Sequence, residues 1–133
     1  MAIARYYLRR SSVTTYKGKA DDFLSNLLEE AQSIGSSDVH LEAYKDLCRV
    51  RFRLDGTLHE RLIIKQSEYP ALINKVKILA KLDIAEKRLP QDGRIFINNN
   101  NGGTDIRVSV IPTIEGEKVV LRILSKDASF LNL

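Results

Sequence analysis

The chain has 133 residues, of which 44% are hydrophobic and 29% are charged, and its formal net charge at pH 7 is +4. This length suits one domain with a core of its own rather than two, and no apolar run approaches the roughly 18 residues needed to cross a bilayer. The single cysteine, Cys48, excludes an internal disulfide and favours the cytoplasm as the compartment.

The positive charge is concentrated in residues 1–20, which contain no acid. Their five cations are Arg5, Arg9, Arg10, Lys17 and Lys19. The remaining 113 residues hold 16 cations and 17 acids, so the rest of the chain is almost neutral. We interpret residues 1–20 as a basic linker or leader; a contact with an acidic partner or with a membrane surface stays open as an alternative.

A helix is predicted from Asp21 to about residue 34, because apolar residues recur there at helical spacing. These residues are Phe23, Leu24, Leu27, Leu28, Ala31 and Ile34. Gly35-Ser36-Ser37 is typical of a helix C-terminus, and Val39 and Leu41 begin a short strand.

A β-hairpin is predicted next. Val50, Phe52 and Leu54 alternate with Arg49, Arg51 and Arg53. We therefore expect Phe52 and Leu54 to be buried and Arg51 and Arg53 to be exposed. Asp55-Gly56 separates this run from the β-rich segment 57–63, and Asp-Gly favours a two-residue type I′ turn.

A second helix is predicted after Ser67, which we assign as its N-cap, with Pro70 in the first turn. The expected buried side chains are Leu72, Ile73, Val76, Leu79 and Ala80. The expected solvated ones are Lys75, Lys77 and Lys81.

The last third of the chain predicts strands. Gln91-Asp92-Gly93 indicates a turn, and strands are expected over 94–98, 104–111 and 118–124, with a polar loop over 98–103. Residues 126–133 resemble the start of a linker. The element order predicts an α+β domain over residues 21–125, in which helices cover one face of a mainly antiparallel sheet.

Three arginines of these strands are candidate binding residues. Arg94 begins one strand, while Arg107 and Arg122 alternate with apolar neighbours and should leave the apolar face. Guanidinium groups offer a planar fork of donors suited to phosphate oxygens. The structural alternative is that these arginines pair with Asp92, Asp105 or Glu117.

Several motifs resemble the type II secretion and type IV pilus assembly ATPases. The matching segments are Ser37-Asp38-Val39-His40-Leu41-Glu42, Arg51-Phe52-Arg53-Leu54-Asp55-Gly56, the run from Leu82 to Arg94, Val108-Ser109 through Pro112-Thr113, Gly116-Glu117, and Val119 to Leu124. The resemblance covers about residues 21–126. It identifies the segment as similar to the smaller domain that precedes the P-loop domain in these enzymes.

The resemblance implies a PAS-like fold within a cytoplasmic homo-hexamer that is peripheral to the inner membrane. Arg94, Arg107 and, with a weaker claim, Arg122 would then contact the phosphates of ATP bound with Mg²⁺ mainly by the P-loop domain, as an arginine finger does. The implied partners are P-loop domains of the same and neighbouring subunits and the inner-membrane secretion or pilus platform proteins. No nucleic acid is expected as a partner.

The chain departs from the family pattern in several places. Ala43 replaces a usual proline, and residues 98–103 replace a more ordinary hairpin loop. The pattern Gly-x-x-x-x-Gly-Lys-[Ser/Thr], the acidic Mg²⁺-binding and water-activating residues, and the tetracysteine zinc motif are absent. The alternatives are an excised domain and a degenerate stand-alone relative, and we expect an excised domain. It should have no catalytic residue and no cofactor or metal of its own, and should be inactive alone.

The alternative function is a nucleic-acid-binding module. Its strand of alternating arginines, Arg49, Arg51 and Arg53, would track phosphates together with the basic leader. No aromatic residues alternate with these arginines to form a stacking platform for bases.

Overall fold

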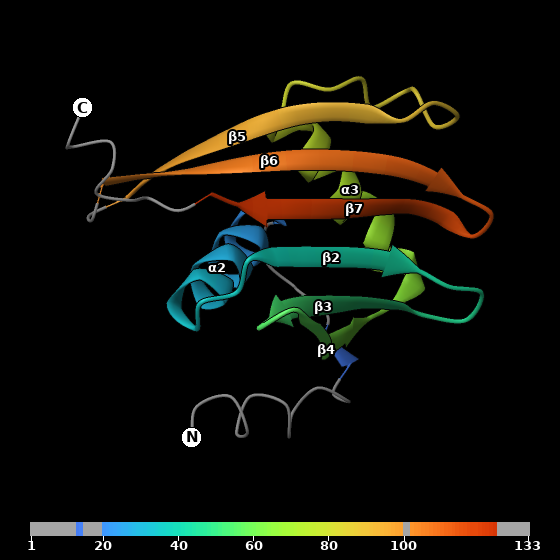
Figure 1. Ribbon diagram of the computed structural model, residues 1–133. Helices are drawn as coiled ribbons and strands as arrows, with labels where there is room; N and C mark the ends of the chain where they lie inside the picture. The colour runs from blue at the N-terminus through green and yellow to red at the C-terminus, as the bar shows by residue number, and fades with distance from the viewer. Residues whose placement is uncertain (1–12, 15–19, 100–101, 125–133) are drawn as a thin grey trace.

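The computed structural model describes residues 13–14, 20–99 and 102–124 (Figure 1). The elements are β1 (Val13–Thr14), α2 (Ala20–Ser33), β2 (Asp38–Ala43), β3 (Cys48–Leu54), β4 (Thr57–Ile64), the 3-10 helix η1 (Gln66–Glu68), α3 (Tyr69–Leu79), β5 (Gln91–Asn99), β6 (Gly102–Thr113) and β7 (Gly116–Ile123). The strand order is β1-β4-β3-β2-β7-β6-β5. Strands β2 to β7 pair antiparallel, and the two-residue β1 joins β4 in parallel.

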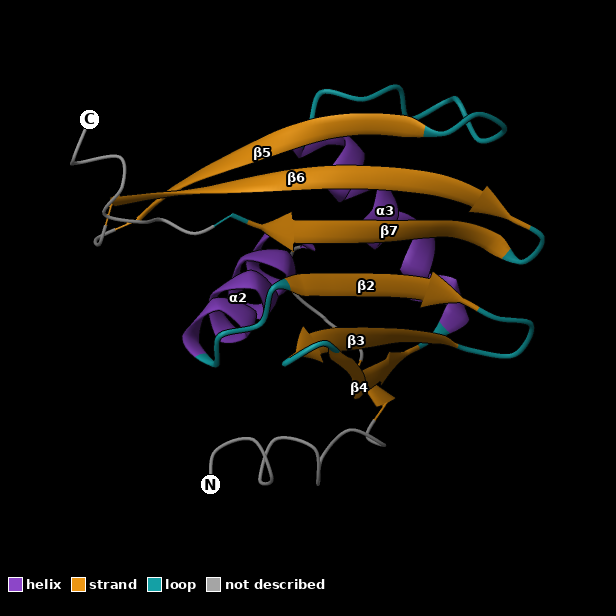
Figure 2. Ribbon diagram, viewed as in Figure 1, coloured by secondary structure: helices purple, strands orange, loops and turns teal. Residues whose placement is uncertain are grey.

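Helices α2 and α3 both lie behind the sheet in Figures 1 and 2, so one face of the sheet is covered and the other is free of helices. The core lies between the helices and the covered face. It includes Leu24, Leu28, Val39, Phe52, Val76, Ile106, Val110 and Leu121. The predicted α+β architecture, with helices on one face of a mainly antiparallel sheet, is confirmed.

The predicted end of the first helix is also confirmed. Gly35 has φ of 81°, a left-handed conformation that suits glycine. The Gly35 amide donates to the Gln32 carbonyl at 3.1 Å, and the Ser36 amide donates to the Ala31 carbonyl at 2.9 Å. These two hydrogen bonds form a Schellman motif, which satisfies carbonyl groups that the helix itself leaves unpaired.

The Asp55-Gly56 hairpin forms as predicted between β3 and β4. Both turn residues have positive φ, 52° and 80°, as a type I′ turn requires. Phe52 and Leu54 are buried. The register shifts between Val50 and Arg51, an irregularity that the sequence pattern did not predict.

The predictions for the second helix were wrong at three residues. Ser67 lies inside η1 rather than at the N-cap, because the chain enters α3 through a 3-10 turn, and the N-cap residue Glu68 makes no side-chain capping bond. The buried side chains of α3 recur at intervals of about four residues, and Lys77 falls on that stripe while Leu79 falls outside it. Lys77 is therefore buried and Leu79 is 39% exposed.

The turn predicted at Gln91-Asp92-Gly93 is instead the first part of β5, paired with β6. Glycine is needed at position 93 for close packing rather than for a turn. A Cβ atom there would lie 2.9 Å from the Ala80 carbonyl oxygen and 3.0 Å from Leu82 Cδ2. The chain after α3 thus passes directly against β5.

Strand β1 lies within the predicted basic leader, and there Val13 and Thr14 pair with Ile63 and Ile64 of β4. Apart from Ala20, which begins α2, the rest of the basic leader lies outside the described residues. So do the expected linker over residues 126–133 and residues 100–101 of the expected polar loop. Within the described part of the chain, no helix combines the length and apolar character needed to cross a bilayer.

Candidate functional site

The three candidate arginines form a row across neighbouring strands. Arg94 of β5 lies opposite Arg107 of β6, and Arg107 lies opposite Arg122 of β7. Directly opposed residues of antiparallel strands have Cα atoms roughly 4.5–5.5 Å apart, and like charges in such positions destabilise a sheet. The row therefore places three cations side by side, an arrangement that needs nearby anions to offset their mutual repulsion.

This arginine row (Arg94, Arg107 and Arg122) lines a single open cleft of about 590 Å³ on the helix-free face. All three residues are exposed. The other lining residues are Asp92, Gly93, Val108, Ser109 and Val120. The structure thus brings together the residues that the sequence singled out, in a concave site large enough for several phosphate groups.

The arginines of the row differ in their partners. Arg94 Nε donates to Asp105 Oδ1 at 3.2 Å, and its Nη2 contacts Oδ2 of the same carboxylate. The hydrogen bond and charge of Asp105 raise the pKa of Arg94. Arg122 Nε donates to Asp38 Oδ1 at 3.1 Å. Among the described residues, Arg107 has neither a hydrogen bond nor an ion pair through its side chain. The structural alternative, in which these arginines pair with nearby acidic residues, is therefore confirmed for Arg94, which pairs with Asp105.

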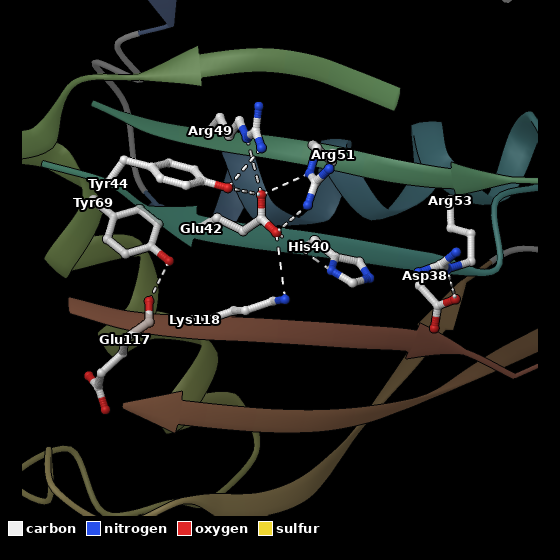
Figure 3. A network of polar contacts seen from close by, with 10 residues as sticks. All are labelled: Asp38, His40, Glu42, Tyr44, Arg49, Arg51, Arg53, Tyr69, Glu117 and Lys118. Atoms are coloured by element: carbon white, nitrogen blue, oxygen red, sulfur yellow. Dashed lines mark hydrogen bonds and ion pairs between the residues drawn. The ribbon is translucent and has the colours of Figure 1, made fainter. Parts of the chain in front are cut away.

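Asp38 connects the arginine row to the next strand. It lies opposite Arg122 on one side and opposite Arg53 of β3 on the other. Its carboxylate lies 3.4 Å from Arg53 Nε (Figure 3) and accepts a hydrogen bond from the Ser37 hydroxyl at 2.9 Å. The Asp38 side chain is only 6% exposed, so this carboxylate is a fixed anchor for Arg122.

A second group of polar side chains occupies the same face, beside the row. We call it the Glu42 cluster; it comprises His40, Glu42, Tyr44, Arg49, Arg51 and Lys118 (Figure 3). The Glu42 carboxylate accepts hydrogen bonds from Arg51 at 2.8 and 2.7 Å and from Arg49 at 3.2 Å. Lys118 Nζ lies 3.6 Å away.

The protonation of this cluster follows from its contacts. Burial acts to raise the pKa of Glu42, but the hydrogen bonds and charge of Arg51, with further hydrogen bonds from Tyr44 and Arg49, outweigh it and lower the pKa to about 2. Burial, followed by the charge of Lys118, lowers the pKa of His40. Glu42 is therefore ionised and His40 neutral at pH 7.

The arginines proposed for nucleic-acid binding are occupied by these carboxylates. Arg49 and Arg51 bind Glu42, Arg49 also lies 3.4 Å from Glu60, and Arg53 lies beside Asp38. Arg51 and Arg53 were expected to be exposed. That prediction was wrong, because their contacts with Glu42 and Asp38 hold them half-buried against the sheet.

The described residues contain no group of three or more histidine, cysteine or acidic side chains that could hold a metal ion. Cys48 is buried, and burial raises its pKa. Sequence reasoning missed Asp38 and Glu42 as organising residues of the helix-free face. The available signal was their alternation with the apolar residues Val39 and Leu41, which places them opposite the arginines of β3.

Comparisons with known proteins give consistent results. The family model described as "Type II/IV secretion system protein" matches residues 15–133. The type II secretion system ATPase E of Vibrio cholerae is 44% identical over 110 residues, which are 83% of this chain and 22% of that protein. The type II secretion system protein E of Pseudomonas aeruginosa is 47% identical over 110 residues, with the same coverage. This chain thus spans about a fifth of the length of these relatives.

Solved structures with a similar fold include that of an ATPase. The X-ray structure of the Legionella pneumophila ATPase DotB aligns with a TM-score of 0.54 and 18% sequence identity. The alignment covers 93% of this chain and 36% of the DotB chain.

Proposed function

The chain belongs to the type II/IV secretion system protein family, and from that premise we propose that it is the PAS-like domain preceding the P-loop domain of a hexameric ATPase. The ATPase would power type II protein secretion or type IV pilus assembly. We infer that its arginine row contacts the phosphates of a nucleotide held mainly by the P-loop domain of the same or a neighbouring subunit.

The observation that carries this proposal is the register of the arginine row. Three guanidinium groups from adjacent strands line one cleft, although like charges in opposed positions destabilise a sheet. Guanidinium groups bind phosphate oxygens through paired hydrogen bonds. They also stabilise the charge that spreads over the transferred phosphoryl group.

The domain would act as one wall of a nucleotide site completed elsewhere. ATP and Mg²⁺ would be held mainly by the P-loop domain, because this sequence has no Gly-x-x-x-x-Gly-Lys-[Ser/Thr] loop to cradle phosphates. Closure of the arginine row onto the phosphates would couple nucleotide binding to movement between the two domains. Alone, the 133-residue chain should not hydrolyse ATP.

The proposed setting follows from the family. We propose a cytoplasmic homo-hexamer, peripheral to the inner membrane, that acts on the secretion or pilus platform proteins. The relatives' names support a role in type II secretion.

The test is steady-state ATP hydrolysis by the complete ATPase that carries this domain. Arg94→Ala and Arg107→Ala should each lower the maximal rate by about ten-fold or more, as expected for arginines that stabilise transition-state charge. Arg53→Ala is the matched control, because Arg53 lies on the same face but does not line the cleft. An equal loss in Arg53→Ala would overturn the specific role of the arginine row.

A further inference from the structure

The cleft contains its own negative charges. Besides the three arginines, it is lined by Asp92, and two further aspartates hold the outer arginines of the row: Asp105 binds Arg94 and Asp38 binds Arg122. These three carboxylates offset part of the positive charge of the row, although Asp38 is shared with Arg53. The cleft does not offer its full positive charge to an incoming anion.

The two ion pairs differ in how firmly they are held. The Arg94 side chain is 64% exposed and that of Asp105 is 20% exposed. Asp38 is 6% exposed and is also bound by Ser37 and Arg53. The Arg122 side chain is 66% exposed, so the two pairs differ in their carboxylates rather than in their arginines. Asp105 is partly exposed and can be hydrated when its arginine leaves, as in an ordinary surface ion pair. Asp38 would keep Arg53 but lose part of the positive charge that compensates its burial, which is unfavourable. The Arg94–Asp105 pair is thus the one that can open.

We propose that Asp105 is an internal competitor for the anion, which holds Arg94 until a ligand with at least two phosphate groups displaces it. This inference rests on the proposed function of the arginine row. Arg107, which has no side-chain partner among the described residues, makes the first contact with the phosphates. Arg94 then exchanges Asp105 for the ligand, and Arg122 stays anchored on Asp38.

The exchange favours a ligand of this class for two reasons. A polyphosphate offers several oxygens and more than one negative charge, so it can bind Arg94 and Arg107 together by charge-assisted hydrogen bonds. A single small anion could satisfy Arg107 without opening the Arg94–Asp105 pair. Asp105 therefore lowers the affinity for any ligand that must contact Arg94, and a ligand that reaches both arginines offsets this cost with its additional hydrogen bonds.

The experiment measures the affinity of the 133-residue chain for inorganic tripolyphosphate by isothermal titration calorimetry, at an ionic strength of about 0.02 M where screening is weak. Asp105→Asn should bind about five-fold tighter than the unsubstituted chain, since removing the competitor recovers the free energy of an exposed ion pair. Asp92→Asn is the matched control. It removes one negative charge from the lining of the cleft, but Asp92 has no ion pair among the described residues. Its gain in affinity should therefore be smaller, about two-fold.

A double-mutant cycle tests whether the gain acts through Arg94. In the Arg94→Ala background, Asp105→Asn should raise the affinity for tripolyphosphate by no more than Asp92→Asn does. An equal gain from Asp105→Asn and Asp92→Asn in the unsubstituted background would overturn the proposal in favour of general electrostatics. Tighter binding cannot result from loss of structure, so a misfolded variant would not mimic the expected result.

A second measurement needs no substitution at Asp105. The Arg94 Nε–H signal in a ¹⁵N NMR spectrum should shift on titration with tripolyphosphate, and an unchanged signal at saturation would overturn the proposal. If binding occurs and is lost in Arg107→Ala while Asp105→Asn brings no gain, the competitor role fails and the proposed function stands. Absence of tripolyphosphate binding by every variant would overturn the competitor role, whereas the proposed function is decided separately by ATP hydrolysis in the complete ATPase.

Discussion

Lys77 Nζ lies 2.7 Å from the Glu117 carboxylate although Lys77 is completely buried. The same ammonium group donates a hydrogen bond to the Glu86 carbonyl at 2.8 Å. These contacts join α3 to the start of β7 and to the segment between α3 and β5. A buried charge is tolerated in a core only when it is paired and hydrogen-bonded, and Lys77 meets that condition.

The first prediction is that Lys77→Ala lowers the free energy of unfolding by about 3–5 kcal/mol, because it leaves the Glu117 carboxylate buried and unpaired. Urea denaturation measures the change. Lys65→Ala is the control, since Lys65 is exposed and should change stability by less than about 0.5 kcal/mol. Similar values for the two variants would contradict the structural role of the Lys77–Glu117 pair.

The second prediction concerns acid stability. The folded-state pKa of Glu42 is lowered from 4.5 to about 2, so ionised Glu42 stabilises the fold above pH 4.5, and this contribution is lost as the pH falls through about 2. The other carboxylates are present in both the unsubstituted chain and Glu42→Gln, so their contributions to the pH dependence cancel when the two proteins are compared. The stability difference between the unsubstituted chain and this variant should therefore shrink by about 2–3 kcal/mol on acidification from about pH 5 to about pH 2. A pH-independent difference would exclude this linkage.

The sequence was sufficient to predict elements whose signals are local. Asp55-Gly56 and Gly35 need positive φ, and the apolar alternation along β3 fixes which side chains face the core. Lys77 and Leu79 lie in the predicted helix, but the prediction of which side chain is buried was wrong, because a small difference in helical phase decides it. A lysine in the core is acceptable only because Glu117 and the Glu86 carbonyl, distant in sequence, lie beside it.

The candidate site was predictable in part. Alternation with apolar neighbours correctly placed Arg107 and Arg122 away from the core, but it gave no strand order. That Arg94, Arg107 and Arg122 lie in one row depends on β5, β6 and β7 being neighbours in register. The pairing of Asp38 with Arg122 links residues 84 positions apart, and no local pattern indicates it.

The third prediction concerns the glycine at the edge of the cleft. Gly93→Ala should lower the free energy of unfolding by about 1–3 kcal/mol, because its Cβ atom would collide with the Ala80 carbonyl oxygen and Leu82. Asp92→Ala, at the neighbouring exposed position, should have a much smaller effect. Chemical denaturation of both variants distinguishes them, and an unchanged stability in Gly93→Ala would mean that the segment after α3 does not pass against β5 as described.

The last prediction concerns nucleic acid. The guanidinium groups of Arg49, Arg51 and Arg53 already bind the carboxylates of Glu42 and Asp38, so this strand offers DNA little unneutralised charge. Binding to a fluorescent duplex at about 0.15 M salt should be no tighter than the 10⁻⁴–10⁻⁶ M range that is typical of non-specific binding.

Fluorescence anisotropy over a series of salt concentrations provides the measurement, and Arg49→Ala/Arg51→Ala provides the control. A dissociation constant well below that range, with a steep salt dependence that this double variant reduces, would favour a nucleic-acid-binding module. Weak binding that the double variant leaves unchanged would instead show that these arginines serve the sheet, where they surround Glu42 and compensate the cost of its burial.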